Sequence, residues 1–256
     1  MIPMLTKSEL PTPALLLDLD KFEANLARMS ARIAKSGKHL RPHAKAHKCV
    51  EIARRQIAAG AIGVCVATIS EAELMSKAGI PGLLLTSPVA DPLKIARIVQ
   101  TGAMAVVDHV QQVEWYQQAA QAANPNVANK KMDLLVDLDV GDHRTGAASL
   151  EQALGIAEAI DRSSHLRLRG IQAYSVHGSH GSGHEERVRV SAECYARAIA
   201  VRDAMAAKGL NTEILTGGST GTWDIDTQVP ELTELQAGSY IFMDMAYRRA
   251  GLDFEQ

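Results

Sequence analysis

Hydrophobic and polar residues follow two different repeats along the chain. Short apolar runs such as Leu83-Leu84-Leu85 and Met104-Ala105-Val106-Val107 leave no polar face, which is typical of parallel strands covered by helices on both sides. Longer segments between these runs repeat apolar residues every three or four positions, as amphipathic helices do. The pattern therefore predicts strands that alternate with helices.

Eight strands and the helices between them can be placed on this pattern. The strands are expected over His39–Lys45, Ile62–Ala67, Gly82–Thr86, Ala103–Asp108, Met132–Val140, Leu166–Tyr174, Glu213–Gly217 and Leu235–Phe242. The helices are expected over Cys49–Ala59, Ser70–Lys77, Pro92–Gln100, Val110–Ala123, Ser149–Ile160 and Glu185–Lys208, with a weak one near Thr227–Leu232.

A further strand and helix lead the chain, at about residues 12–35. The strand is expected over Ala14–Leu19 and the helix over Lys21–Lys35. Eight β/α units in one chain of 256 residues predict a single α/β domain, 1–256, with the (β/α)₈ barrel of triosephosphate isomerase type. A doubly wound open sheet is the alternative.

Composition and charge narrow the class of protein. Hydrophobic residues make up 46% of the chain and charged residues 22%, with a net charge of −2, so nothing predicts a nucleic-acid partner or a membrane-binding basic patch. Cys49, Cys65 and Cys194 are too few and too scattered for a disulfide framework. With no signal-peptide pattern at the start, a soluble cytoplasmic protein is expected.

Reactive residues fall where the predicted strands end, which is where barrel enzymes carry their active sites. The segment Arg41–Lys48 holds two lysines, two histidines and an arginine. Neighbouring cations lower the pKa of a lysine and make it a nucleophile toward an aldehyde. Lys45 is the candidate, although such a segment also fits a solvated basic turn.

Two glycine-bearing turns suggest a phosphate site. Thr216–Gly221 follows the seventh predicted strand, and Gly238-Ser239 lies in the eighth. Backbone N–H groups of such turns can approach a phosphate closely, and barrels often bind phosphate after these two strands. Each turn alone also fits a plain loop.

Arg144 and three histidines complete the candidates. Arg144 could neutralise a ligand oxygen or form an ion pair with Asp142 or Asp139. His177, His180 and His184 could bind zinc, but they lie in a Gly/Ser-rich stretch with no CxxC or HExxH partner. A general base among them is favoured instead, because neutral histidine titrates near the working pH.

Several segments resemble a family of enzymes that use pyridoxal 5′-phosphate. Leu40–Cys49 is similar to the cofactor-lysine motif of D-threonine aldolases, D-serine dehydratases and 3-hydroxy-D-aspartate aldolases or dehydratases. These are fold-type III enzymes with the fold of the alanine racemase N-terminal domain. The resemblance continues, in the same order, through Gly63–Val66, Ser70–Glu73, Asp137–Gly141, Gln172–Tyr174, Thr216–Gly221 and Glu234–Asp244.

The resemblance implies roles for particular residues. Lys45 would hold the cofactor covalently, whereas Lys48 would not, and Arg144, Gln172 and Tyr174 would lie beside its ring. The residues implied to bind the cofactor are Lys45, His43, Arg144, Gln172, Tyr174, Thr216, Gly218, Ser219, Thr220, Gly238, Ser239 and Tyr240. The implied activity is that of a homodimeric lyase that cleaves or dehydrates D-3-hydroxy amino acids.

Two departures from the family pattern affect the expected metal site and the choice of the catalytic base. Family members carry a C-terminal β domain with a metal pair, and here the sequence ends at Asp253–Gln256, so that domain is expected to be absent and no metal ligand is assigned. A divalent metal (Mn²⁺, Mg²⁺ or Zn²⁺) is expected only if such a domain is supplied. Two residues are inserted after Tyr174 relative to the family, and His177 is the predicted catalytic base.

Other functions stay open on sequence grounds. A single-domain pyridoxal-phosphate homeostasis protein with little catalysis shares this fold and length, and an amino-acid racemase shares the fold. A barrel that binds no pyridoxal phosphate is the plainest alternative.

Overall fold

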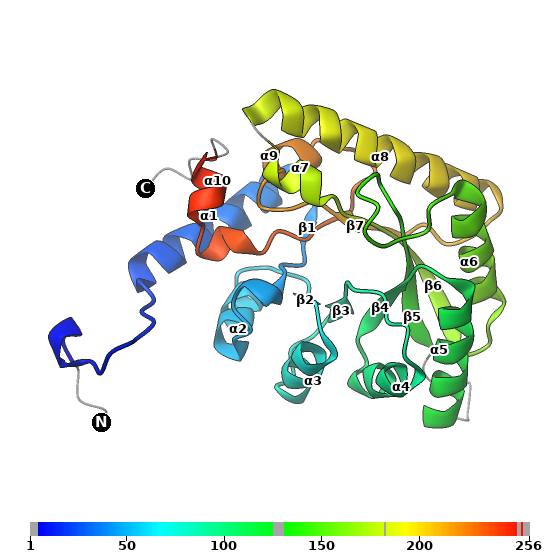
Figure 1. The fold of residues 1–256 in the computed structure, drawn as a ribbon, viewed down its shortest axis with the longest axis horizontal. Coiled ribbons are helices and arrows are strands. Elements are labelled where there is room, and N and C mark those ends of the chain that lie inside the picture. Colours follow the sequence, from blue (N-terminus) through cyan, green and yellow to red (C-terminus); the bar gives the residue numbers. More distant parts are fainter. Residues whose placement is uncertain (1–4, 125–130, 182, 250–251, 253–256) are drawn as a thin grey trace.

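The strands pair side by side, all parallel, in a computed structural model that describes residues 5–124, 131–181, 183–249 and 252 (Figure 1). They form one eight-stranded sheet in the order β1-β8-β7-β6-β5-β4-β3-β2. The bounds are β1 His39–Leu40, β2 Cys65–Val66, β3 Leu84–Leu85, β4 Met104–Val107, β5 Met132–Asp137, β6 Leu166–Ala173, β7 Ile214–Gly217 and β8 Glu234–Leu235.

Hydrogen bonds between the first and last strands of this order close the sheet. Ile62 N–H donates to the Leu40 carbonyl and Cys65 N–H donates to the Pro42 carbonyl, both at 2.9 Å, and His43 bridges Cys65 in the parallel sense. Because β1 pairs with β8 on its other side, the sheet is a closed barrel. The predicted (β/α)₈ barrel is confirmed, and the open doubly wound sheet is excluded.

Helices cover the outside of the barrel (Figure 1). The α-helices of the described residues are α1 Leu19–Ser36, α2 Val50–Ala58, α3 Ile69–Lys77, α4 Pro92–Thr101, α5 Val110–Ala123, α6 Leu150–Arg162, α7 Val176–His180, α8 Gly183–Ala207, α9 Trp223–Asp226 and α10 Met245–Arg249. Short 3₁₀ turns are η1 Lys7–Glu9, η2 Ala44–Ala46 and η3 Ser239–Ile241.

Helix α1 precedes the barrel in sequence but packs beside β1 and the turn after β8, where the helix following the eighth strand lies in a (β/α)₈ barrel. Its buried stripe, Phe22, Leu26, Met29 and Ile33, recurs every three or four residues, and the helix contacts β1 and η3. Asp18 caps its first turn by accepting the Lys21 N–H at 3.2 Å, and Gly37 ends it with φ +69°. The predicted helix over Lys21–Lys35 is therefore confirmed.

The core has two parts, which follow from the alternation of side chains along each strand. Cys65, Leu84, Val106, Leu135 and Ile214, one from each of five strands, form a small separate cluster. Their strand neighbours pack instead with the apolar stripes of the helices. The small cluster therefore fills the barrel interior, and the larger one lies between barrel and helices.

Two predicted elements are wrong. Residues 14–18 form no strand, and Leu15 is 102% exposed. The apolar composition of this segment predicts a strand, but no described strand pairs with it. The weak helix expected near Thr227–Leu232 is α9, Trp223–Asp226, instead. Two carbonyls of the expected segment, those of Val229 and Pro230, accept hydrogen bonds from Lys38 Nζ at 2.8 Å, and residues 227–232 form turns and not a helix.

Several strands are shorter than predicted at their C-terminal ends. Lys45 lies in the 3₁₀ turn η2 rather than in a strand, and Ser239–Ile241 form η3 after β8. The chain therefore leaves the sheet earlier than predicted at these strand ends, and the turns that follow form the mouth of the barrel. None of the described helices has both the length and the apolar character needed to cross a membrane.

Candidate active site

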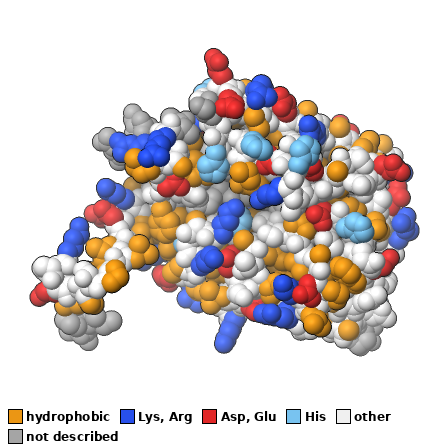
Figure 2. Space-filling model, viewed as in Figure 1, with side chains coloured by type: hydrophobic (Ala, Val, Ile, Leu, Met, Phe, Trp, Pro, Cys, Tyr) orange, Lys and Arg blue, Asp and Glu red, His pale blue; other side chains and the backbone are white. Residues whose placement is uncertain are grey.

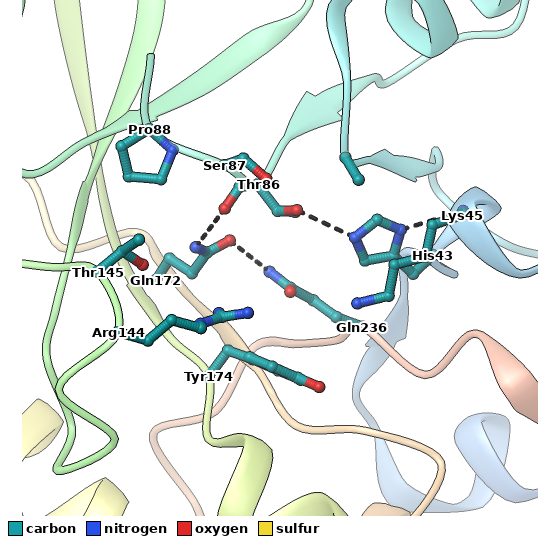
Figure 3. A pocket seen from close by; sticks show the side chains of 11 residues that line it. His43, Lys45, Thr86, Ser87, Pro88, Arg144, Thr145, Gln172, Tyr174 and Gln236 are labelled. Atoms are coloured by element: carbon teal, nitrogen blue, oxygen red, sulfur yellow. Dashed lines mark hydrogen bonds between the residues drawn. The ribbon is translucent and has the colours of Figure 1, made fainter. Parts of the chain in front are cut away.

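A cavity of about 230 Å³ opens at the C-terminal ends of the strands. Lysine, arginine and histidine side chains gather around this mouth on the face shown in Figure 2. The cavity is lined by His43, Lys45, Ala67, Thr86, Ser87, Pro88, Arg144, Thr145, Gln172, Tyr174 and Gln236 (Figure 3).

Lys45 projects into this cavity from η2. Its Nζ lies 5.4 Å from the centre of the Tyr174 ring. Burial around the amine, followed by the positive charge of Arg144, lowers the pKa of Lys45 below its ordinary value. More of this amine is therefore neutral, and nucleophilic, near neutral pH than an ordinary lysine would be.

The positive charge that acts on Lys45 comes from across the mouth and not from its own segment. Arg41 forms a buried ion pair with Glu234 at 2.7 Å, and Lys48 pairs with Glu71 at 3.2 Å. The cations next to Lys45 in sequence are thus compensated. Arg144 supplies the effect that the sequence attributed to the whole basic segment.

His43 fixes the turn that carries Lys45. Its Nδ1 accepts the Lys45 backbone N–H at 3.3 Å, and its Nε2 lies 3.0 Å from Thr86 Oγ1. Burial, and then the charges of Lys45, His47 and Arg144, hold the pKa of His43 well below its usual range. The ring is therefore neutral, and because Nδ1 accepts, Nε2 carries the proton and donates it to Thr86.

The floor of the cavity is a network of amides and hydroxyls. Gln172 Nε2 donates to the Thr86 carbonyl at 3.0 Å and to Asp137 Oδ1 at 2.8 Å. Gln236 Nε2 donates to Gln172 Oε1 at 3.1 Å and to Thr216 Oγ1 at 3.0 Å. Each bond joins different strands, so the network fixes the orientation of both amides under the cavity.

Asp137 lies beneath this floor. Its Oδ2 accepts a hydrogen bond from Thr145 Oγ1 at 2.9 Å. Burial raises the pKa of this carboxyl to about 6, although its bonds to Gln172 and Thr145 favour the charged form. Thr145, the neighbour of Arg144, is thereby attached to strand β5.

The loop from Leu138 to Ala147 places Arg144 over the cavity. Asp139 N–H donates to the Ala147 carbonyl at 3.1 Å, and Gly146 N–H donates to Asp108 Oδ2 at 3.1 Å. Gly146 has φ +105°, and a Cβ at this position would lie 2.2 Å from the Asp139 nitrogen. The loop can therefore close only with a glycine here.

Arg144 faces an aromatic ring and not a carboxylate. Its Cζ lies 5.2 Å from the centre of the Tyr174 ring. The two acids considered for an ion pair have other partners, because Asp139 binds His143 Nδ1 and Asp142 binds His177 Nδ1, each at 2.8 Å. Neither acid therefore pairs with the guanidinium, which is suited to an anionic ligand oxygen.

The two glycine-bearing turns meet beside the lysine turn. Tyr240 N–H donates to Thr220 Oγ1 at 2.9 Å, and a Cβ on Gly238 would lie 2.6 Å from the His43 carbonyl oxygen. The backbone N–H groups of Gly218, Thr220, Gly238 and Ser239 donate to no acceptor within the described part of the chain. Unused backbone donors in glycine-bearing turns suit a phosphate, so the residues present fit pyridoxal phosphate.

The predicted residues fall into two groups. His43, Lys45, Arg144, Gln172 and Tyr174 line the cavity, and Thr216 is bound to its floor through Gln236. Gly218, Ser219, Thr220, Gly238, Ser239 and Tyr240 belong to the adjoining turns, and their role toward phosphate stays a prediction. Tyr240 is fully buried, and its hydroxyl accepts a hydrogen bond from Gln56 Nε2 at 3.1 Å.

His177, the predicted base, is not among the residues that line the cavity. It lies on α7 with an exposed ring held by Asp142, so its role also stays a prediction. His180 stacks on Tyr247, with ring centres 5.3 Å apart. Within the described residues, no three or more His, Cys, Asp or Glu side chains come together to hold a metal ion.

Sequence reasoning missed part of the lining, namely Ala67, Thr86, Ser87, Pro88, Thr145 and Gln236. Thr86 and Gln236 both sit at or just beyond the ends of strands, β3 and β8. The rule that barrel sites lie at strand ends could therefore have found them.

Comparison with known proteins agrees with this geometry. The family model described as alanine racemase, N-terminal domain, matches residues 17–246. A 3-hydroxy-D-aspartate aldolase from Paracoccus denitrificans (strain Pd 1222) is 35% identical over 97% of this chain and 64% of its own. A D-threonine aldolase from an Arthrobacter species is 38% identical over 92% of this chain and 62% of its own.

A solved structure is similar over the same region. The crystal structure of D-threonine aldolase from Filomicrobium marinum superposes with a TM-score of 0.89 at 35% identity, covering 93% of this chain and 64% of that one. The chain thus spans slightly less than two thirds of the length of these relatives.

Proposed function

We propose, from the premise that this chain belongs to the alanine racemase N-terminal domain family, that it binds pyridoxal phosphate through Lys45 and acts as a lyase on D-3-hydroxy amino acids. The observation that carries the proposal is the position of Lys45. Its amine, with a lowered pKa, shares one cavity with Arg144 and Tyr174 and lies beside turns with unused backbone donors. The aldolase names of the relatives support the reaction class.

The residues of the site would divide the work as follows. Lys45 would supply the neutral amine, and the turns after β7 and β8 would hold the phosphate. Arg144 would stabilise negative charge on the ring, while Gln172 and Tyr174 would orient it. When bound, the cofactor supplies an electron sink for a carbanion at the substrate Cα.

The chain's own groups would move the protons. In aldol cleavage, a base takes the proton of the β-hydroxyl as the Cα–Cβ bond breaks and the aldehyde leaves, and Cα then takes up a proton to give glycine. In dehydration, a base takes the Cα proton and the β-hydroxyl then leaves. We propose His177 as the base, because Asp142 holds its Nδ1 at 2.8 Å and orients the ring.

Absorbance tests the binding of the cofactor. Purified protein should show the band of lysine-bound pyridoxal phosphate at about 410–430 nm. Lys45→Ala should abolish the band, whereas Lys48→Ala should keep it, because the Lys48 amine is paired with Glu71. Borohydride reduction followed by peptide mass mapping should place the label on Lys45. A band that survives Lys45→Ala would refute the assignment.

Product analysis tests the reaction. D-threonine should yield glycine and acetaldehyde if cleavage dominates, and ammonia with a 2-oxo acid if dehydration does. The assay should be run with and without added Mn²⁺, since a divalent metal is part of the family expectation. Cofactor binding without either product would favour the non-catalytic homeostasis role.

We also propose that the protein works in the cytoplasm as a homodimer. Its three cysteines are free, which suits a reducing compartment. Size-exclusion chromatography with light scattering would test the dimer directly.

A further inference from the structure

A buried carboxyl that the proposed function does not use lies behind the turn after β7. Asp226, on α9, is 2% exposed. Ser191 Oγ of α8 donates to its Oδ1 and Thr222 Oγ1 donates to its Oδ2. A Cβ on Gly218 would lie 2.6 Å from Asp226 Oδ2, so the carboxyl sits directly against the turn proposed for the phosphate.

A chain of hydroxyl groups connects this carboxyl with the turn. Thr222 Oγ1 and Ser219 Oγ lie 3.2 Å apart, and either can be the donor. Thr222 Oγ1 also accepts the Ser219 backbone N–H at 3.2 Å, and Ser219 Oγ accepts the Gly221 N–H at 3.0 Å. All three side chains are buried, so water does not easily replace these bonds.

The charge of Asp226 decides which way the hydroxyl protons point, because each hydroxyl has one proton to donate. When the carboxylate is ionised, Thr222 gives its proton to Asp226. Thr222 can then only accept from Ser219, so the Ser219 proton points inward. Ser219 has no proton left for an anion on the other side of the turn.

Protonation of Asp226 reverses the two hydroxyl links between this carboxyl and Ser219. The acid donates to Thr222 Oγ1, Thr222 donates to Ser219 Oγ, and the Ser219 proton is free to point outward. Both arrangements satisfy the same neighbours with the same oxygen positions. One proton taken from solvent is therefore enough to turn Ser219 from an acceptor into a donor.

We infer that Asp226 is a positioning residue for the cofactor phosphate, and that its carboxyl carries a proton when Ser219 donates a hydrogen bond to that phosphate. This inference rests on the proposed function, which assigns the phosphate to this turn. Binding of the phosphate is then linked to uptake of one proton. The affinity for pyridoxal phosphate should therefore be higher below neutral pH than above it. This change with pH should exceed any change in the affinity for pyridoxal, which has no phosphate.

The groups that face Asp226 indicate that Asp226 itself changes charge near neutral pH. Burial, and then the nearby Asp224 of α9, raise the pKa of Asp226 to about 7 although its two hydroxyl bonds oppose this. Cys194 and Tyr195 of α8 also face it, and burial raises the pKa of both far above neutral. These two groups therefore stay uncharged across the range in which Asp226 titrates.

Titration of the full chain with pyridoxal phosphate and with pyridoxal tests the inference. Both Kd values are measured from the absorbance band. The ratio of the Kd for pyridoxal phosphate to the Kd for pyridoxal should rise about tenfold from about pH 6 to about pH 8.5. In Asp226→Asn, the amide donates to Thr222 permanently. This variant should bind at alkaline pH as tightly as the wild type does at acidic pH, with the extra pH dependence gone.

Matched variants separate this role from a structural one. Asp224→Asn, two residues away, should keep a pH dependence of the same size but move its midpoint to lower pH, because the Asp224 charge raises the pKa of Asp226. Ser219→Ala should lose it and bind at all pH values as weakly as the wild type does at alkaline pH. If Asp226→Asn does not fold, Thr222→Val should remove the pH dependence and Thr222→Ser should keep it.

Three outcomes would overturn the inference. Asp226→Asn with the wild-type pH dependence would refute it while leaving the proposed function intact, and so would an equal pH dependence for pyridoxal and pyridoxal phosphate. Wild-type protein with no band at any pH would refute the proposed function, and this inference with it.

Discussion

The amine of Lys45 depends on a residue almost one hundred positions away in the sequence. Arg144 reaches the same cavity from the loop after β5, and both side chains approach the Tyr174 ring. Two cations near one ring repel each other, so the neutral form of the lysine is favoured. The pairing is a property of the folded barrel and of neither segment alone.

Arg144→Gln should therefore make Lys45 less reactive at neutral pH. Removal of the positive charge raises the pKa of the amine, so a smaller fraction is neutral. A change of about one pKa unit would slow Schiff-base formation up to about tenfold near pH 8. The measurement is the pH profile of Lys45 labelling by pyridoxal and borohydride, read by mass spectrometry.

Arg97→Gln is the matched control for this experiment. Arg97, on α4, is also an arginine but is paired with Glu73 at 2.7 Å. Its loss should leave the Lys45 profile unchanged. An unchanged profile in Arg144→Gln would show that burial alone lowers the pKa of Lys45.

Residues with reactive groups could be found from sequence together with their roles, whereas for the residues that hold them the strand-end rule gives at most the position and not the role. His43, Lys45, Arg144, Gln172 and Tyr174 all line the cavity as the family motifs imply. Thr86 and Gln236 were missed because a threonine or glutamine carries no sign of which atom it will bind. Their hydrogen bonds form only when the closed barrel brings the ends of the non-adjacent strands β3, β6 and β8 around one mouth.

At the scale of elements, the loop between β5 and α6 shows how backbone geometry supports chemistry. Its ends are joined by a bridge between Leu138 and Ala147, and its tip carries Arg144. The bridge requires a positive φ and a side-chain-free position at Gly146. The loop is thus a rigid arm, and its shape depends on one glycine.

Gly146→Ala should displace this arm. The new Cβ would lie 2.2 Å from the nitrogen of Asp139 at φ +105°, so the loop must open, at a cost of about 1–3 kcal/mol in the free energy of unfolding. Arg144 moves with it, and the affinity for pyridoxal phosphate should fall several-fold. Urea unfolding and absorbance titration measure the two effects.

Gly155→Ala provides the comparison. Gly155 lies within α6, and a Cβ there would meet nothing within 4 Å. Alanine should therefore stabilise the helix by up to about 1 kcal/mol without changing cofactor affinity. Equal affinities in the two variants would mean that the loop does not position Arg144.

Helices were easier to predict than strand ends, for a physical reason. The three-to-four repeat of α1 and α5 is a property of the segment itself, so their positions agree closely with the expectation. A strand end depends on how far its neighbour extends. Four of the strands have two residues within the sheet, and the adjoining residues turn to form the mouth.

At the scale of the whole molecule, closure of the barrel is what brings the site together. The strand count and order follow from the alternating pattern, but the hydrogen bonds between β1 and β2 that close the ring do not. The run Ala14–Leu17 also shows that strand pairing cannot be predicted from composition. Its composition suggests a strand, yet pairing is decided by the rest of the fold.

Closure also buries two carboxyls whose protonation should be visible in the stability of the whole protein. Burial raises the pKa of Asp137 to about 6 and that of Asp226 to about 7, from the ordinary 3.8. Between about pH 4 and these values, the folded protein holds protons that the unfolded chain has lost. Their contribution to stability is therefore full at acidic pH and declines as the pH rises through the folded pKa.

His43 and His47 act in the opposite direction and hide this effect in the wild type. Burial lowers the pKa of both, so stability from these rings rises with pH until the unfolded histidines are neutral. The difference between wild type and a single Asp→Asn variant removes the histidine contribution, because the rings are common to both proteins. That difference isolates one carboxyl at a time.

The free energy of unfolding of wild type minus that of Asp226→Asn should therefore decline from about pH 4 and level off near pH 7, by at most about 1.4 kcal/mol per pH unit. For Asp137→Asn the same difference should level off about one pH unit earlier, because the folded pKa of Asp137 is about 6. Urea unfolding of cofactor-free protein at several pH values measures both curves. Each variant is the other's control, since the two carboxyls lie on different elements, β5 and α9. Differences that do not change with pH would mean that both acids are ionised in the folded, cofactor-free barrel, and the proton on Asp226 would then have to be taken up entirely when the phosphate binds.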